Sequence, residues 1–272
     1  MQVGIFARTV TQKVFTKDPK GYQKANNLQN RDLEDVLKEY IIKWKENASI
    51  MDIGCGDGSA TTGLWTKYIP ENFMVIVGSD KSQNCVNFAK TKYESERIKF
   101  MTLDIEDDLP SELQGCFDHV VSNYTFMWVQ QQEKAFSNIY NLLAKDGNCL
   151  IIFLATCNIY ENYIKLSRTS KWNHYLKDVK TKFISPYHES QDPETEIRSL
   201  MKKIGFRYID IKVKTRTFEF VSGIIELKEM LKSFNPFNGL EHKWEDFMDD
   251  YVKLDPNAGT FLYKLLVVSG TR

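Results

Sequence analysis

Ile50-Met51-Asp52-Ile53-Gly54-Cys55-Gly56-Asp57-Gly58-Ser59 predicts the fold, because an apolar strand breaks into a glycine-rich turn that leads into a helical segment. Glycine is needed where the backbone takes positive φ or approaches a ligand without a Cβ in the way. Alternating glycines after a strand are typical of a nucleotide-binding turn, although a plain strand-to-helix connection remains an alternative. A dinucleotide fingerprint needs glycine at its sixth position. Counting from Gly54, that position is Ser59, which disfavours an NAD site.

Two acids follow at the ends of the next two predicted strands. Asp80 closes the apolar run 74–79 and lies beyond Gly58 at close to the separation of about 20 residues expected of a ribose-binding carboxylate. The alternative is that Asp80 caps the helix that begins near Ser82. Asp104 closes the run 98–103 and is followed by Ile105. Because all three features fall at strand ends in one order, we expect them to share a ligand site.

This series resembles the cofactor site of the S-adenosylmethionine-dependent methyltransferases. The resemblance implies that Asp104 holds the adenine amino group, that Ile105 packs on the ring, and that Asp80 takes the ribose hydroxyls. The predicted cofactor-binding residues are Tyr22, Asp52, Gly54, Gly56, Gly58, Asp80, Lys81, Asp104, Ile105 and Asn123.

The charge and cysteine patterns narrow the class of protein. The 36 Lys and Arg residues balance 36 Asp and Glu residues, which argues against a dedicated nucleic-acid binder. The 5 cysteines have no C-x-x-C spacing, so neither a disulfide framework nor a zinc site is indicated. The apolar run 149–155 is too short to span a bilayer. We therefore expect a cytoplasmic protein without stable membrane insertion, metal or nucleic acid, and the oligomeric state stays open, a homodimer included.

Strands and helices are predicted to alternate through the first two-thirds of the chain, which indicates a doubly wound, mostly parallel α/β sheet of the Rossmann-like kind. The strands are expected near 49–53, 74–79, 98–103, 117–122 and 148–155, and the helices over 59–68, 82–93 and 130–143.

The last third of the chain is predicted to build a helical cap and to complete the sheet. Segments 206–221 and 260–268 are expected to form an antiparallel strand pair, which brings the sheet to seven strands. Segments 157–204 and 222–252 are mostly helical in pattern, with Asp192 and Pro193 opening one helix. We expect one domain over 1–272, with 1–20 as an N-terminal arm.

The methyl acceptor is expected at the loop 123–128, which follows the fourth strand. Together with other segments, this loop makes the chain resemble the juvenile hormone acid O-methyltransferases of insects from about Tyr22 onward. The segments that resemble this family are 27–32, 103–106, 115–120, 124–128, 183–188 and 235–238. Where the family commonly has histidine before the tryptophan of this loop, the chain has Met127.

The second resemblance implies the reaction and its acceptor-binding residues. Enzymes of that family methylate the carboxylate of juvenile hormone acids or farnesoic acid, so the partner would be a small lipophilic acid and the products its methyl ester and S-adenosylhomocysteine. Gln29 and Trp128 would hold the acceptor carboxylate, and Tyr22 would close over the cofactor side. Trp128 could instead be a core aromatic, and Gln29 a residue of the helix start.

Three alternatives to this function remain. Met127 leaves open a catalytically weak or silent paralogue that binds cofactor or terpenoid. A methyltransferase for another small-molecule acid, or for an oxygen or nitrogen nucleophile, is a further alternative, although the latter would call for a base or a metal. His174 and His188 are the tempting bases, but a carboxylate is already ionised at neutral pH, so we interpret both as surface or cap residues.

Overall fold

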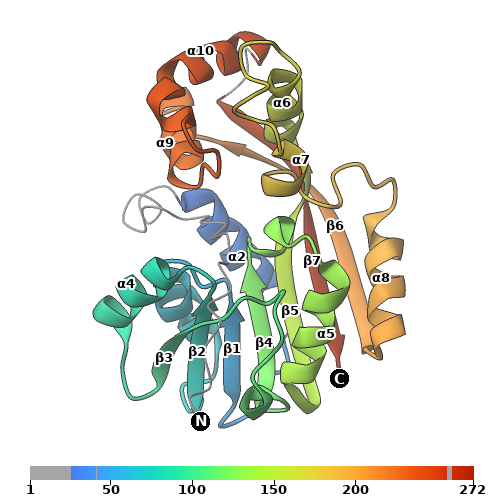
Figure 1. The fold of residues 1–272 in the computed structure, drawn as a ribbon. Coiled ribbons are helices and arrows are strands. Elements are labelled where there is room, and N and C mark those ends of the chain that lie inside the picture. Colours follow the sequence, from blue (N-terminus) through green and yellow to red (C-terminus); the bar gives the residue numbers. More distant parts are fainter. Residues whose placement is uncertain (1–25, 41, 256–258) are drawn as a thin grey trace, which may run out of the picture.

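A seven-stranded sheet forms the centre of the computed structural model, which describes residues 26–40, 42–255 and 259–272 (Figure 1). The strand order is β3-β2-β1-β4-β5-β7-β6, and only β7 runs antiparallel to its neighbours. The prediction of a mostly parallel sheet with an antiparallel C-terminal pair is confirmed. The strands are β1 Ser49–Ile53, β2 Val75–Asp80, β3 Ile98–Thr102, β4 Phe117–Asn123, β5 Leu143–Cys157, β6 Arg207–Glu219 and β7 Thr260–Thr271.

Helices connect these strands, and their labels follow Figure 1. Among the described residues, the α-helices are α2 Asn27–Glu39, α3 Thr66–Tyr68, α4 Gln83–Tyr93, α5 Gln132–Leu142, α6 Asn158–Ser167, α7 Val179–Lys182, α8 Pro193–Ile204, α9 Ile224–Ser233 and α10 Trp244–Leu254. Short turns of other helical types are η1 Thr61–Trp65, η2 Ser111–Leu113, η3 Phe126–Trp128 and η4 Leu240–Lys243.

Local sequence signals explain where two of these helices begin. Ser82 caps α4, since its side chain accepts a hydrogen bond from the backbone N–H of Cys85. Asp192 caps α8 in the same way through Thr195, with Pro193 at the first helical position as predicted. Gly205, at a φ of 117°, ends α8 in the left-handed conformation.

A helical cap stands over one end of the sheet. Figure 1 shows α6, α7, α9 and α10 above the end at which the parallel strands finish. The strands β5, β6 and β7 are 15, 13 and 12 residues long, whereas β1 has 5, so the long strands reach toward this cap. The helix α8, which falls inside the predicted cap range 157–204, lies beside β6 and α5 instead.

The topology places a ligand crevice between β1 and β4. The chain winds outward from β1 through β2 to β3 and then returns to β4 on the other side of β1. Loops that leave β1 and β4 therefore diverge, and in sheets of this kind ligands bind at this reversal, beyond the carboxyl ends of the strands. Ile53 and Asn123 are the last residues of these two strands.

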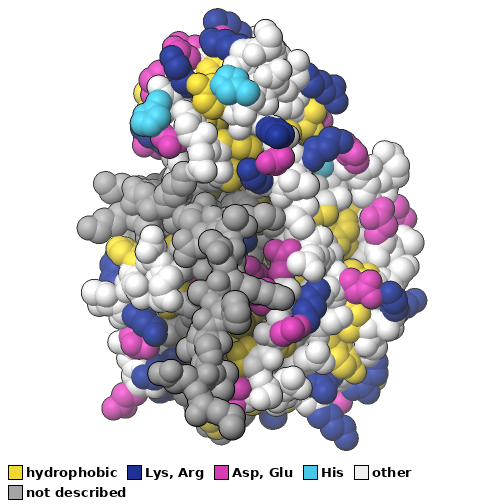
Figure 2. Space-filling view, viewed as in Figure 1, with side chains coloured by type: hydrophobic (Ala, Val, Ile, Leu, Met, Phe, Trp, Pro, Cys, Tyr) yellow, Lys and Arg dark blue, Asp and Glu magenta, His cyan; other side chains and the backbone are white. Residues whose placement is uncertain are grey.

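Charged side chains of both signs are interspersed over the face of the molecule in Figure 2, as the balanced composition suggests. Among the helices of the described ranges, none combines the length and hydrophobicity needed to cross a membrane. Each of the five cysteines is a free thiol, and only that of Cys116 is exposed.

Candidate active site

A large cavity opens at the carboxyl ends of β1, β2 and β4 and extends under the cap. Its empty volume is about 1110 Å³, which includes space open to solvent at its mouth. The structure therefore brings together most residues that the sequence predicts for both cofactor and acceptor. Those that line this cavity are Gln29, Gly54, Gly56, Asp80, Lys81, Asp104, Ile105, Asn123 and Trp128.

The glycine turn after β1 forms the floor of the cavity. Gly54 and Gly56 have φ values of 75° and 55°, which L side chains rarely adopt. The backbone N–H groups of Gly54 and Cys55 donate to the carbonyl oxygen of Ser79 at 2.7 and 2.9 Å, which ties the turn to β2. A Cβ on Gly54 would lie 2.0 Å from Oγ1 of Thr125, so the turn also packs closely against the loop that follows β4.

Asp80 is held rigidly at the end of β2. Its Oδ2 accepts from the backbone N–H of Gly56 at 3.0 Å, and its Oδ1 accepts from that of Ser82 at 2.8 Å. Burial raises the pKa of Asp80, and these two hydrogen bonds oppose the shift. Because Ser82 itself caps α4, Asp80 is not the cap residue of that helix. Each carboxylate oxygen has a second lone pair with which it can accept from a ligand.

Asp104 and Ile105 lie on the same wall, beyond Asp80. Oδ1 of Asp104 accepts from the backbone N–H of Glu106 at 3.0 Å, and Ile105 is buried. The carboxylate of Glu106 accepts from the backbone N–H groups of Gln130 and Gln131 at 2.9 and 2.8 Å. This segment therefore also supports the loop on which Trp128 lies.

Asp52 and Gly58, two further predicted cofactor residues, do not line the large cavity. Asp52 lines a smaller adjoining cavity of about 370 Å³, which shares Gln29, Gly54, Gly56 and Asn123 with the larger one. Gly58 lines neither cavity within the described residues. A Cβ there would lie 2.8 Å from Cβ of Ala89, so its lack of a side chain serves helix packing. Tyr22 lies outside the described residues.

Gln29 and Asn123 meet where the two cavities join. Gln29 lies in the first turn of α2, and its carbonyl oxygen accepts from Nδ2 of Asn123 at 3.3 Å. Oε1 of Gln29 and Oδ1 of Asn123 are buried without a hydrogen-bond partner in the described part of the chain. Since buried polar atoms are normally paired, a polar ligand at this junction would satisfy them.

Trp128 ends the short turn η3, which two contacts stabilise. Nε2 of the buried Gln132 donates to the carbonyl oxygens of Phe126 and Val129, both at 2.9 Å. The Trp128 ring centroid lies 5.5 Å from that of Phe183 and 5.8 Å from that of Phe234. Trp128 is only partly buried and faces the cavity. Trp128 therefore packs against the hydrophobic core with one side and borders the cavity with the other, rather than being fully buried.

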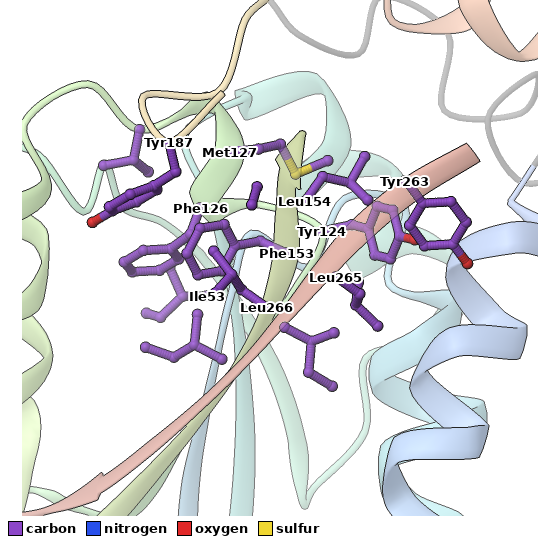
Figure 3. Close-up of a cluster of buried hydrophobic side chains, with 14 of the residues drawn as sticks. Ile53, Tyr124, Phe126, Met127, Phe153, Leu154, Tyr187, Tyr263, Leu265 and Leu266 are labelled. Atoms are coloured by element: carbon purple, nitrogen blue, oxygen red, sulfur yellow. The ribbon is translucent and has the colours of Figure 1, made fainter. Parts of the chain in front are cut away.

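An apolar compartment continues from Trp128 toward the cap. Most of the residues that line this compartment could not be predicted from the sequence. They come from β5, α6, α9 and β7 and share no local motif. Met127, which stands where the family commonly has histidine, is buried at the edge of the same apolar cluster as Leu154 and Tyr124 (Figure 3). The compartment is lined by Leu154, Cys157, Ile159, Tyr160, Phe183, Met230, Leu231, Phe234 and Phe261.

The two candidate histidines do not line this cavity. Nδ1 of His188 is hydrogen-bonded to Oγ1 of Thr156 at 2.6 Å, and His174 packs on the ring of Tyr175. In the part of the chain that the structure describes, no three His, Cys, Asp or Glu side chains gather in a way that could hold a metal ion.

The fold and this cavity define the class of protein as an S-adenosylmethionine-dependent methyltransferase. The family model of the methyltransferase domain matches residues 44–217. The solved complex of Haemonchus contortus phosphoethanolamine N-methyltransferase 2 with S-adenosyl-L-methionine shares the fold, with a TM-score of 0.59 at 17% identity over 93% of this chain and 56% of that one.

The comparison with curated relatives is more specific. The chain is 42% identical to the juvenile hormone acid O-methyltransferase of Bombyx mori over 85% of its length and 83% of that protein. It is 35% identical to the Drosophila melanogaster enzyme over 86% of its length and 80% of that protein. The chain therefore belongs to the juvenile hormone acid O-methyltransferase family, and the resemblance seen in the sequence is confirmed.

Proposed function

We propose that this enzyme methylates the carboxylate of a lipophilic farnesoid acid of the juvenile hormone acid class and releases the methyl ester. The observation that supports this is that one cavity joins most of the proposed cofactor residues, an amide oxygen of Gln29 that has no partner among the described residues, and a long apolar compartment. A terpenoid chain in that compartment would leave its carboxylate beside Gln29 and Trp128. The names of the relatives support the same acceptor.

The described residues fit the cofactor that the family requires. Asp80 would accept from both ribose hydroxyls, Asp104 from the adenine amino group, and Ile105 would pack on the ring. Asp52 lies by the smaller cavity, where the carboxylate would face the ammonium of the methionine part. Lys81 and Asn123 line the larger cavity between these positions, and Tyr22 completes the proposed set.

The reaction needs alignment more than it needs a base. A carboxylic acid with a pKa of about 4–5 is ionised at neutral pH, so no proton has to be removed and no metal is required. S-adenosylmethionine supplies a methyl group activated by its sulfonium, and the bond to sulfur breaks, with its electron pair leaving on S-adenosylhomocysteine, as the bond to the carboxylate oxygen forms.

Gln29 and Trp128 would orient the carboxylate for this transfer. Both side chains offer neutral N–H donors, and a half-turn of the Gln29 amide exchanges its oxygen for its nitrogen at the same point. Neutral donors hold one carboxylate oxygen without stabilising the anion as strongly as a cation would. The apolar walls favour a step in which an anion and a cation become two neutral products.

The proposal is tested by incubating the protein with methyl-labelled S-adenosylmethionine and a panel of acids. We expect label in a base-labile ester, with farnesoid acids preferred over short or polar acids. Turnover of a different acid only would change the acceptor assignment. Cofactor binding without turnover of any acid would favour the silent paralogue that Met127 leaves open.

We expect Trp128→Phe to lower kcat/KM for the acid about 10- to 100-fold, because a hydrogen bond to a charged group contributes about 1.5–3 kcal/mol. The dissociation constant of S-adenosylmethionine should stay within about threefold of the wild type. Trp44→Phe is the matched control, since Trp44 is also partly buried but packs on His119, away from the cavity. A kcat/KM unchanged by Trp128→Phe would refute the acceptor role.

We also expect cofactor affinity to rise with pH, because burial raises the pKa of Asp52 to about 7. The nearby charge of Asp80 raises this pKa further, whereas the hydrogen bond from Thr61 lowers it. An unfolded Asp titrates near 3.9, so the folded apoprotein binds an extra proton between about pH 4 and pH 7 and loses stability as pH rises through that window. The cofactor ammonium favours ionised Asp52, which makes binding release a proton.

The dissociation constant of S-adenosylmethionine should therefore fall about tenfold from pH 6 to pH 8. Calorimetric titration at several pH values measures this slope, and the proton release appears as a dependence on buffer ionisation enthalpy. In Asp52→Asn the slope should disappear. A pH slope that persists in Asp52→Asn would mean that another group takes up the proton.

A further inference from the structure

Asp32 is a completely buried carboxylate that joins the two elements on which Gln29 and Trp128 lie. It is located in α2, one helical turn after Gln29, and its side chain is 0% exposed. Its Oδ2 accepts from the hydroxyl of Tyr124 at 2.6 Å and from that of Tyr263 at 2.6 Å. Figure 3 shows these two tyrosines side by side next to α2.

The other oxygen of Asp32 is paired with cations. Oδ1 accepts from Nη2 of Arg31 at 3.0 Å and from Nη1 of Arg216 at 3.0 Å, while Nη2 of Arg216 donates to Asp35 at 2.5 Å. Buried charge is tolerated only where it is paired and hydrogen-bonded, and here both oxygens have two partners each. Helix α2 is thereby anchored to β6, β7 and the loop after β4.

Tyr124 is the residue at which this anchor reaches the active site. Its φ is 55°, a left-handed conformation that is unusual for a tyrosine, and it lines the cavity. Its backbone N–H donates to the carbonyl oxygen of Ile152 at 2.7 Å. The next residue, Thr125, contacts the glycine turn, since its Oγ1 donates to the carbonyl oxygen of Gly54 at 3.3 Å. The direction of the chain from Tyr124 to Trp128 therefore depends on how Tyr124 is held.

The hydroxyl of Tyr124 acts as a permanent donor to Asp32. Burial raises the pKa of Tyr124 well above its ordinary value, and the charge of Asp32 raises it further, so the phenol stays protonated. A second contact joins the same two elements, since Nδ2 of Asn123 donates to the carbonyl oxygen of Gln29. Helix α2 and the loop 123–128 are thus connected at two successive turns of the helix.

We propose that the hydrogen bond between Asp32 and Tyr124 positions Gln29 against Trp128, so that both donors meet one acceptor carboxylate. Asp32 is a positioning residue, because it touches neither substrate nor cofactor and acts through Tyr124. The inference rests on the proposed function in that Gln29 and Trp128 are taken as the acceptor-binding pair. Displacement of reacting groups by about 1 Å costs about 100-fold in rate, so a loosened loop should lower turnover strongly.

Tyr263 provides a matched control within the same network. Its hydroxyl donates to the same oxygen of Asp32 over the same distance, and it also accepts from Nη2 of Arg31 at 2.5 Å. It lies on β7 and does not lead into the acceptor loop. Tyr263→Phe therefore removes at least as many hydrogen bonds as Tyr124→Phe but leaves the connection to the loop intact.

The experiment compares Tyr124→Phe and Tyr263→Phe with the wild type, each in the full chain. Both should lower the Tm by about 2–6 °C, since each loses a buried hydrogen bond to a charged group. Only Tyr124→Phe should lower kcat, by about 10-fold or more, with the dissociation constant of S-adenosylmethionine within about threefold of the wild type. The rates are measured on whichever acid the wild type methylates fastest, so an error in the farnesoid assignment leaves the comparison valid.

Hydrogen–deuterium exchange gives a readout that does not require turnover. Backbone exchange over residues 124–128 should rise in Tyr124→Phe and stay at the wild-type level in Tyr263→Phe. Equal losses of kcat in the two variants would show that the network serves stability alone. Unchanged kcat and exchange in Tyr124→Phe would also overturn the proposal.

Discussion

Asp80→Ala is expected to weaken the binding of S-adenosylmethionine by at least about 100-fold. A partly buried carboxylate that accepts from two ribose hydroxyls makes two charge-assisted hydrogen bonds of about 1.5–3 kcal/mol each, and 1.4 kcal/mol is tenfold in affinity. The substitution also removes the acceptor for the backbone N–H groups of Gly56 and Ser82. The glycine turn would therefore lose its fixed position together with the ribose contacts.

Calorimetric titration of cofactor into each variant measures this effect. Asp80→Asn should be intermediate, because one oxygen remains as an acceptor. Asp108→Ala is the control for loss of an acid, since Asp108 is 97% exposed and pairs only with Lys134 among the described residues. Wild-type affinity in Asp80→Ala would rule out the ribose assignment, and a lower kcat with unchanged affinity would give Asp80 a role in the chemistry instead.

Gly54→Ala should abolish measurable turnover and weaken cofactor binding by about 100-fold or more. The added Cβ would lie 2.0 Å from Oγ1 and 2.7 Å from Cβ of Thr125, and the φ of 75° is strained for any L side chain. Either the glycine turn or the acceptor loop would have to move by about 1 Å, which disturbs both halves of the site. Activity and affinity should consequently fall together.

Gly63→Ala is the matched control for this variant. Gly63 lies in the turn η1, and nothing stands within 4 Å of a Cβ built there. Alanine in a helical turn is favoured over glycine by about 1 kcal/mol, so Gly63→Ala should be active and slightly more stable. Adding Thr125→Gly to Gly54→Ala should restore part of the activity by removing the clash. Full activity in Gly54→Ala alone would show that the turn and the loop are not tightly packed.

The order of elements, and the gathering of most proposed cofactor residues around one cavity, could be predicted well from the sequence. The strand that ends at Ile53, the glycine turn and the acids Asp80 and Asp104 are local features, and each depends only on neighbours in the chain. The start of the helix at Ser82 was predictable for the same reason. Gly58 illustrates the limit, because its contact with Ala89 is tertiary and no local pattern distinguishes it from Gly54 and Gly56.

The acceptor half was predictable only in part. Gln29 and Trp128 were proposed through family resemblance, whereas the apolar compartment beyond them is assembled mostly from β5, α6, α9 and β7. The helix α8 could not be placed from its pattern, since an amphipathic helix can pack on a sheet or in a cap equally well. It lies beside β6 and α5.

By itself, the sequence determined the class of this protein, because strand periodicity, glycine spacing and acids at strand ends are short-range signals of a fold that places cofactor residues in series. Only the tertiary structure decided how the acceptor side is built. Asp32, Tyr124, Arg216 and Tyr263 are far apart in the chain, and each alone is an ordinary polar residue. They form one network only because folding buries the carboxylate of Asp32. A buried charge is stable only where it is hydrogen-bonded or ion-paired, and here the donors come from several different elements.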